Sequence, residues 1–277
     1  MAIILLVVFI RIFSNSYLNV LQKVLTLRGE HSSVVNFYSY LGLSILGIIF
    51  CQNLQFNGAL LGNILLMGLL GAIGNYFIIK ALSYGELSTL APINSYKPIV
   101  ALFFGFFFLE EYPNLLEIFG VGLIIIGSFI LTKTKMFYNK AVLYRIFALI
   151  FSGIEAIFIK KVILLTDISS AFFYWAITGL FFSMLFLLIS GHKVLIRKNN
   201  IKYQLFLILM VALMQYSTNY VFSRMNVAYA LALFQLSTIV SVFLGVNIFK
   251  EKDLTRKLIA SLVMIFGAII IILNMTP

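Results

Sequence analysis

Residues Ser88 to Leu109 read STLAPINSYKPIVALFFGFFFL, and this stretch decides how the fold is interpreted. It is long and apolar enough to cross a bilayer, yet it contains Pro92, Pro98, Lys97 and a polar run at residues 94–96. A charge in hydrocarbon is costly and is rare there without a partner or a function. Proline removes a helix hydrogen bond and kinks or breaks the helix. Broken, charged spans of this kind line binding sites in transporters.

The composition of the whole chain predicts an integral membrane protein. Of its 277 residues, 62% are hydrophobic and 10% are charged, and the mean hydropathy is +1.08. Soluble domains are usually ~25% charged. The length allows about ten spans of roughly 20 residues with short loops, and leaves no stretch for a soluble domain. We attribute the net charge of +11 to loops that contact lipid headgroups, and expect no nucleic-acid partner.

Ten apolar segments can be marked along the chain, and we expect each to form a transmembrane helix. Short loops with turn residues separate them. The segments are Ala2–Leu25, Val34–Phe50, Ala59–Ala81, Ser88–Leu109, Leu115–Thr132, Ala141–Leu164, Ser170–Ser190, Lys202–Phe222, Tyr229–Phe249 and Lys257–Leu273.

The second half of the chain repeats the first. Residues Ser83 to Gly127 match Ser223 to Gly267 without a gap, at an offset of 140 residues. Each half therefore has five spans, at residues 1–135 and 136–277. Because five is odd, the second half enters the membrane from the opposite side, which predicts an inverted repeat with a site between the halves near mid-membrane. The aligned pairs include Asn75 with Gln215, Gly105 with Gly245, and Glu111 with Glu251.

The run from Lys80 to Leu131 resembles the EamA-like branch of the drug/metabolite transporter superfamily. It reads KALSYGELSTLAPINSYKPIVALFFGFFFLEEYPNLLEIFGVGLIIIGSFIL and has a mid-helix proline, a small residue, a closing Glu and then a Gly-bearing span. The second half, Ser223 to Leu273, resembles it less closely, since Thr238 stands where Pro98 stands. The resemblance implies ten helices in two inverted five-helix halves. It also implies a central cavity, lined mainly by spans 1, 3, 4, 6, 8 and 9, that opens alternately to either side. The family moves amino acids, nucleobases and related metabolites, drugs and sugar conjugates.

The orientation in the membrane is predicted differently by two arguments. The loops after spans 1, 3, 5, 7 and 9 contain 15 Lys and Arg residues, and the other loops contain three. Basic loops face the cytoplasm, so this count places both termini outside. The family resemblance implies both termini inside. We expect an integral protein of a bacterial cytoplasmic membrane, as a monomer or homodimer, and leave the two orientations open.

Three ionisable residues lie inside the predicted spans, namely Arg11, Lys97 and Glu155. Lys97 or Arg11 could hold an anionic substrate group, and Glu155 could hold a cationic group or a coupling proton. One acid beside one or two bases suits a zwitterion such as an amino acid. The structural alternatives are an ion pair between Lys97 and Glu155 and, for Arg11, a side chain that snorkels to the membrane surface. We expect no cofactor, apart from possible proton coupling.

Neutral polar residues form a second candidate set, and several occupy equivalent places in the two halves. Buried amides need hydrogen-bond partners, which substrate or water in a cavity would supply. The alternative is hydrogen bonding between helices, worth ~0.6 kcal/mol each on average. The predicted substrate-binding set is Asn75, Tyr76, Asn94, Ser95, Tyr96, Gln215, Tyr216, Asn219 and Gln235, with Asn15 and Asn19 as further candidates and with Pro92 and Pro98 as hinges.

These features favour a secondary transporter of a small polar metabolite, amino acid or nucleobase-like, that works by alternating access. The 16% aromatic content permits an alternative, a multidrug exporter with a more apolar cavity. An integral-membrane enzyme is disfavoured because no cluster of acids, His or Cys has a catalytic or metal-binding spacing. His31 and His192 are loop residues without ligand-spaced neighbours, so no metal site is expected.

Overall fold

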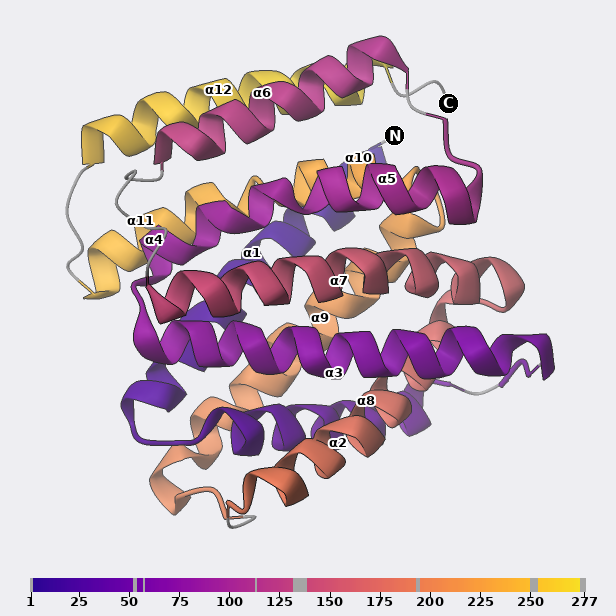
Figure 1. The fold of residues 1–277 in the computed structure, drawn as a ribbon, viewed down its shortest axis with the longest axis vertical. Helices are drawn as coiled ribbons and strands as arrows, with labels where there is room; N and C mark the ends of the chain where they lie inside the picture. Colours follow the sequence, from indigo (N-terminus) through magenta and orange to yellow (C-terminus); the bar gives the residue numbers. More distant parts are fainter. Residues whose placement is uncertain are drawn as a thin grey trace.

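The computed structural model describes residues 2–51, 54–56, 58–112, 114–131, 139–192, 195–249 and 254–274. Every regular element in these ranges is a helix, which confirms the all-α prediction. Figure 1 shows the helices stacked side by side across the molecule.

Each of the ten predicted apolar segments is helical over most of its length. Eight are single α helices: α1 (Ala2–Leu27), α2 (Ser32–Phe50), α3 (Leu61–Tyr84), α6 (Leu115–Leu131), α7 (Lys140–Leu165), α8 (Ile168–Ser190), α9 (Ile201–Phe222) and α12 (Leu254–Asn274). Two short 3-10 helices, η1 (Gly58–Leu60) and η3 (Lys198–Asn200), precede α3 and α9.

The remaining two segments are interrupted. The first broken span, residues 87–109, consists of α4 (Leu87–Leu90), the 3-10 helix η2 (Ala91–Tyr96) and α5 (Lys97–Leu109). The second broken span, residues 227–249, consists of α10 (Val227–Phe234) and α11 (Ser237–Phe249). The two spans are equivalent in the sequence repeat.

The length and hydropathy of the helices agree with a membrane protein. Within the described ranges, seven helical segments are long and apolar enough to cross a bilayer. Three shorter apolar helices, Lys97–Leu109, Ile118–Gly127 and Leu262–Ile271, fall below that length. The count of ten membrane-crossing helices therefore stays a prediction.

The helices pack in pairs that join the two halves of the chain. The most extensive pairs are α3 with α7, α6 with α12, α1 with α9, and α2 with α8. Helix α3 also packs on α8, and α5 packs on both α7 and α10. In Figure 1 the pair α6 and α12 forms one edge of the molecule, and α2 and α8 lie at the opposite edge. The broken spans lie beside α6 and α12, and α1, α3, α7 and α9 fill the middle.

Glycines allow the closest of these approaches. A Cβ added at Gly120 would lie 2.8 Å from the carbonyl oxygen of Gly267, and one added at Gly127 would lie 2.8 Å from that of Ala260. The backbones of α6 and α12 can meet only because these positions lack side chains. Gly122, by contrast, has open space at its Cβ position.

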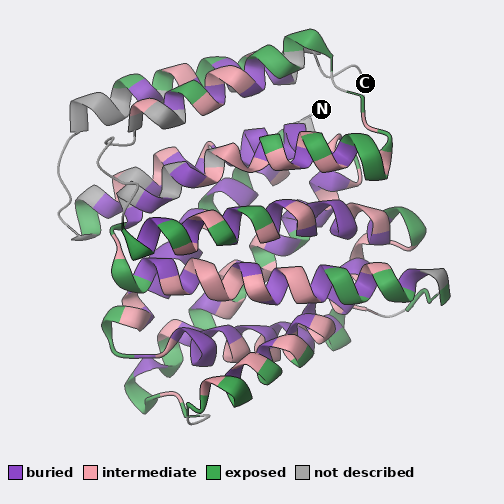
Figure 2. Cartoon of the chain, in the orientation of Figure 1, coloured by how far each residue is buried: buried purple, intermediate pink, exposed green. Residues whose placement is uncertain are grey.

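Burial is reversed at the outer surface relative to a soluble protein. Figure 2 shows that buried residues gather in the interior, while exposed ones extend along the outer helices. Many exposed side chains are large and apolar, such as Leu115, which is 82% exposed, and Ile189, which is 83% exposed. Exposed apolar surface of this extent suits contact with lipid tails.

Candidate functional site

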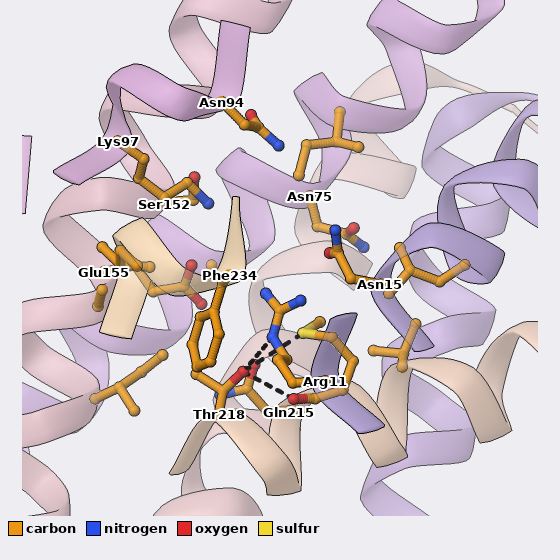
Figure 3. Close-up of a pocket in the computed structure, with 18 of the residues that line it drawn as sticks. Arg11, Asn15, Asn75, Asn94, Lys97, Ser152, Glu155, Gln215, Thr218 and Phe234 are labelled. Carbon is orange, nitrogen blue, oxygen red and sulfur yellow. Dashed lines mark hydrogen bonds between the residues drawn. The ribbon is translucent and has the colours of Figure 1, made fainter. Parts of the chain in front are cut away.

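A central cavity of about 100 Å³ lies where helices of both halves meet. Its walls come from α1, α2, α3, α7, α8 and α9 and from the two broken spans. Figure 3 shows Lys97 and Asn94 on one side and Arg11 and Gln215 on the opposite side. Seven residues of the predicted substrate-binding set line the cavity: Arg11, Asn75, Asn94, Lys97, Glu155, Gln215 and Gln235. The two further candidates, Asn15 and Asn19, line it as well.

Glu155 on α7 is the acid of this cavity. Its Oε1 accepts a hydrogen bond of 2.6 Å from Nε1 of Trp175 on α8. A Cβ at Gly71 on α3 would collide with that same oxygen and lie 3.0 Å from Trp175 Nε1. The absence of a side chain at Gly71 therefore leaves room for the carboxylate and its indole donor.

Arg11 on α1 contributes a buried cation. Its Nε donates to Thr218 Oγ1 at 2.6 Å, and its guanidinium carbon lies 4.6 Å from the centre of the Phe234 ring. Its Nη1 is buried and has no hydrogen-bond partner in the part of the chain that the structure describes. At 8% exposure the side chain points into the protein, so the snorkelling alternative is wrong.

Lys97 contributes a second cation from the first residue of α5. No ion pair within 4 Å joins its ammonium to Glu155 in the described structure, so the structural pair considered above is not formed in this conformation. Figure 3 shows both side chains beside the same space. The cavity thus has two cationic groups and one acid, each in place to contact a bound molecule.

The amides of the cavity divide into satisfied and unsatisfied groups. Asn75 accepts from Gln22 Nε2 at 3.0 Å and donates to Asn36 Oδ1 at 2.6 Å, which is the interhelical bonding considered as the alternative. Gln215 donates to Asn219 Oδ1 at 2.9 Å. Asn94 differs, because its Oδ1 is buried and no described residue forms a hydrogen bond with it. A buried acceptor left open in this way favours a ligand or water as its donor.

Four predicted site residues do not line the cavity. Successive side chains on a helix point ~100° apart. Because Asn75 and Gln215 face the cavity, the next side chains, Tyr76 and Tyr216, point away from it. The hydroxyl of Tyr76 accepts from Lys80 Nζ at 3.1 Å, and Tyr216 is 43% exposed. Asn219 lies behind Gln215, and Tyr96 is also outside the lining. The side chains of Ser95 and Pro92 lie outside the described residues.

The structure adds lining residues that the sequence analysis did not select. Ser152 lies one helical turn before Glu155, and Thr218 lies one turn after Gln215. Residues three positions apart lie on the same face of a helix, so this spacing from residues already selected could have identified Ser152 and Thr218. Tyr40, Trp175 and Phe234 also line the cavity. They could not be separated from the many lipid-facing and core aromatics by residue type.

Both broken spans bend beside the cavity, and the interruptions have different sequences. In the first, Pro98 is the second residue of α5, where a missing amide hydrogen costs little. The carbonyl oxygen of Leu90 accepts from Arg145 Nε on α7 at 3.2 Å. The second bends without proline, and the carbonyl oxygen of Ser237 accepts from Ser16 Oγ on α1 at 2.9 Å.

A partly buried ion pair connects the end of the first broken span to the second half. Lys160 Nζ donates to Glu111 Oε1 and to the carbonyl oxygen of Met225, both at 2.7 Å. Glu111 Oε2 accepts from the amide of Val227 at 2.9 Å. The pair therefore ties the segment after α5 to α7 and to the connection between α9 and α10. Glu251, the repeat counterpart of Glu111, lies outside the described residues.

The two histidines meet in the loops. The rings of His31 and His192 stack with centroids 3.5 Å apart, and His31 Nδ1 accepts from the amide of Ser33. Partial burial and the nearby charges of His192 and Lys80 lower the pKa of His31. Within the described ranges, no group of three or more His, Cys, Asp or Glu residues could hold a metal ion.

Comparison with known proteins gives a family and a fold. The model of the EamA-like transporter family matches residues 2–133 and again residues 139–273. A crystal structure of a protein superposes with a TM-score of 0.75 at 14% sequence identity, covering 99% of this chain and 97% of that chain. At that identity the likeness shows the fold alone. The search of curated proteins gave no match.

Proposed function

The chain belongs to the EamA-like transporter family, and from this premise we propose that it is a secondary transporter of a small polar metabolite. The family consists of membrane transporters of the drug/metabolite type rather than enzymes, and its model matches this chain in two repeats. The chain is thus an integral membrane protein. We place it in a bacterial cytoplasmic membrane.

The observation that supports the substrate class is the charge arrangement of the central cavity. Arg11 and Lys97 face a shared space with Glu155, and neither cation has a carboxylate partner within 4 Å in the described structure. Buried charges are costly unless paired. A zwitterion such as an amino acid would supply a carboxylate for the cations and an ammonium for Glu155. Asn94 Oδ1 offers a further acceptor.

The size of the cavity favours a small molecule over a drug-sized one. The cavity of about 100 Å³ is smaller than the ~300–1,000 Å³ typical of drug-sized ligand pockets. The multidrug alternative is favoured by the aromatic lining of Tyr40, Trp175, Phe222 and Phe234. Those rings surround charged groups, however, and a large apolar substrate would leave these groups unpaired.

We propose alternating access between two inverted halves as the mechanism. The contact pairs support this. In the sequence repeat, α7 is the counterpart of α1 and α3 is the counterpart of α9. Exchanging each helix for its counterpart therefore turns the pair α1 with α9 into the pair α7 with α3, and both pairs are in contact. The ion pair of Glu111 with Lys160 would hold one end of the cavity closed and would separate when that end opens. Glu155 is our candidate for a coupling proton, because it is the acid of the cavity.

Reconstitution into liposomes tests the proposed function. Purified protein should take up labelled amino acids or nucleobases down an imposed gradient, and unlabelled substrate should compete. The Lys97→Ala variant should lose this uptake, while Lys140→Ala, which removes an exposed lysine at the start of α7, should keep it. Normal uptake by Lys97→Ala would contradict the assigned site. Transport of apolar dyes without competition by polar metabolites would favour the multidrug alternative.

A further inference from the structure

Two surface pockets next to the start of α9 share one lysine. The first, of about 460 Å³, is basic and is lined by Arg28, Lys198, Asn199, Lys202 and Tyr203. The second, of about 420 Å³, is mainly apolar and runs along α9. Lys198 belongs to both pockets. Neither pocket contains a residue of the central cavity.

The basic pocket is held in place by contacts between two loops. Arg28 Nη2 donates to the hydroxyl of Tyr203 at 2.9 Å, and its guanidinium lies 4.3 Å from the centre of that ring. Arg197 Nη1 donates to the carbonyl oxygen of Arg28 at 2.9 Å. The backbone connection between α1 and α2 is thereby fixed to the segment that precedes α9.

The charge of this pocket is not cancelled by the nearest acid. Glu30 is buried, and its Oε1 accepts from the amide of Arg197 at 3.0 Å and from Asn200 Nδ2 at 2.6 Å. Glu30 offsets only part of the positive charge, because the exposed side chains of Arg28, Lys198 and Lys202 carry three positive charges. A phosphate group is a strong partner for such a cluster.

The apolar pocket continues from this cluster along one face of α9. Ile201, Leu205 and Ile208 follow Lys198 at helical spacing. From residue 198 to residue 208 a helix rises roughly 15 Å, which is about half of the ~30 Å bilayer core. The charges therefore lie at headgroup depth when the apolar stripe spans one leaflet. Gln204, which also lines this pocket, is 3% exposed, and its Oε1 has no hydrogen-bond partner among the described residues.

We propose that the two pockets together form a binding site for one anionic phospholipid. The phosphodiester would contact Arg28, Lys198 and Lys202, and an acyl chain would lie along Leu205 and Ile208. A zwitterionic lipid fits less well, because its positive headgroup would meet three cations without an exposed acid.

The test measures lipid binding to delipidated protein by native mass spectrometry and by thermal unfolding in detergent. Phosphatidylglycerol should bind and raise the melting temperature, and phosphatidylcholine should do neither. Each removed basic residue should weaken phosphatidylglycerol binding about fivefold, so the triple change Arg28→Ala, Lys198→Ala and Lys202→Ala should weaken it about 100-fold. A matched triple change at Lys140, Lys161 and Arg224, which line neither pocket, should have little effect.

Two further measurements separate a lipid from a free phosphate. Leu205→Trp fills the apolar pocket and keeps all three charges, so it should reduce phosphatidylglycerol binding. Glycerol phosphate, which has the headgroup without chains, should bind far more weakly than the lipid. Lys198→Ala alone changes an exposed residue and provides a variant that should fold normally. The proposal would be overturned by equal binding of both lipids, by an equal loss in the matched triple variant, or by glycerol phosphate binding as tightly as the lipid.

Discussion

The two broken spans hold equivalent places in the two halves of the chain, yet their sequences differ where they bend. Both are interrupted beside the central cavity, and residues of both line it. The first broken span has proline and a charge at the bend, and the second has neither. Pro92, Lys97 and Pro98 stand opposite Ala232, Ser237 and Thr238 in the repeat alignment.

The comparison separates what the fold requires from what one half adds. In each broken span, a carbonyl oxygen near the bend is satisfied by a side chain from the first helix of the other half. Arg145 on α7 donates to Leu90, and Ser16 on α1 donates to Ser237. The bend therefore belongs to both halves, whereas the lysine belongs to one. We infer that Lys97 serves the substrate rather than the bend.

The largest expected effect comes from exchanging the residues at positions 97 and 237. Lys97→Ser should lower the transport efficiency about 100-fold, since a hydrogen bond to a charged group contributes ~1.5–3 kcal/mol. Adding Ser237→Lys should restore part of the activity if the cavity requires a cation irrespective of its side. Initial uptake rates in liposomes, compared at matched protein density, measure both effects.

The serine itself provides the control for that exchange. Ser237→Ala removes a neutral hydroxyl at the equivalent position and should change uptake far less than Lys97→Ser. If Ser237→Ala were as damaging as Lys97→Ser, the two bends would be functionally equivalent and the inferred role of the lysine would be wrong.

A smaller effect should follow from filling the space beside Glu155. Gly71 aligns with Val211 in the repeat, and both line the cavity, so the halves differ here as well. Gly71→Ala would place a methyl group against the carboxylate and Trp175, and overpacking of this kind costs ~1–3 kcal/mol. We expect an approximately tenfold loss of uptake, in line with that cost, and a lower melting temperature.

Gly62 on the same helix is the matched control, because a Cβ there meets no atom within 4 Å. Gly62→Ala should keep normal uptake and should stabilise the helix by up to about 1 kcal/mol. Equal losses in the two variants would show that the loss at Gly71 does not arise from the contact with Glu155.

Most of the fold could be predicted from the sequence, because residue type reveals the apolar segments and residue spacing reveals the repeat. The ten apolar segments coincide with helices within a few residues at their ends. The bend of the second broken span was not foreseen, since Gln235 and Leu236 lack the proline signal. That bend depends on Ser16 and on other contacts with α1, which lie far away in sequence.

The candidate site was predicted where residue type alone was informative. Arg11, Lys97 and Glu155 were selected because charges are rare in spans, and all three line the cavity. Tyr76 and Tyr216 were selected because they occupy equivalent places in the two halves, and helix geometry turns them away from the cavity. Trp175 was not assigned to the site, since its contact with Glu155 joins two helices whose rotation the sequence does not specify. The substrate-binding role of the whole set stays a prediction.

The hydrogen bond from Ser16 to Ser237, at the interruption of the second broken span, should make a small but measurable contribution to stability. Ser16→Ala removes the donor to Ser237, and hydrogen bonds between membrane helices average ~0.6 kcal/mol. A slightly lower melting temperature in detergent is the expected result. Ser14→Ala is the control, because Ser14 is buried on the same helix and, among the described residues, bonds only to carbonyls of its own helix. If the melting temperature of Ser14→Ala fell as far as that of Ser16→Ala, the hydrogen bond between the two halves would not explain the loss of stability.

The smallest effect is expected from replacing the proline that first drew attention to the chain. Pro98 lies in the first turn of α5, where helices tolerate proline because that amide has no intrahelical partner. Pro98→Thr gives the first broken span the residue of the second, which bends without it. Uptake should change by less than about twofold, since the main cost of losing proline is ~0.4–1 kcal/mol through the unfolded state. A severe loss of uptake with normal thermal stability would instead support the predicted role of Pro98 as a hinge, and the two bends would then differ in motion as well as in charge.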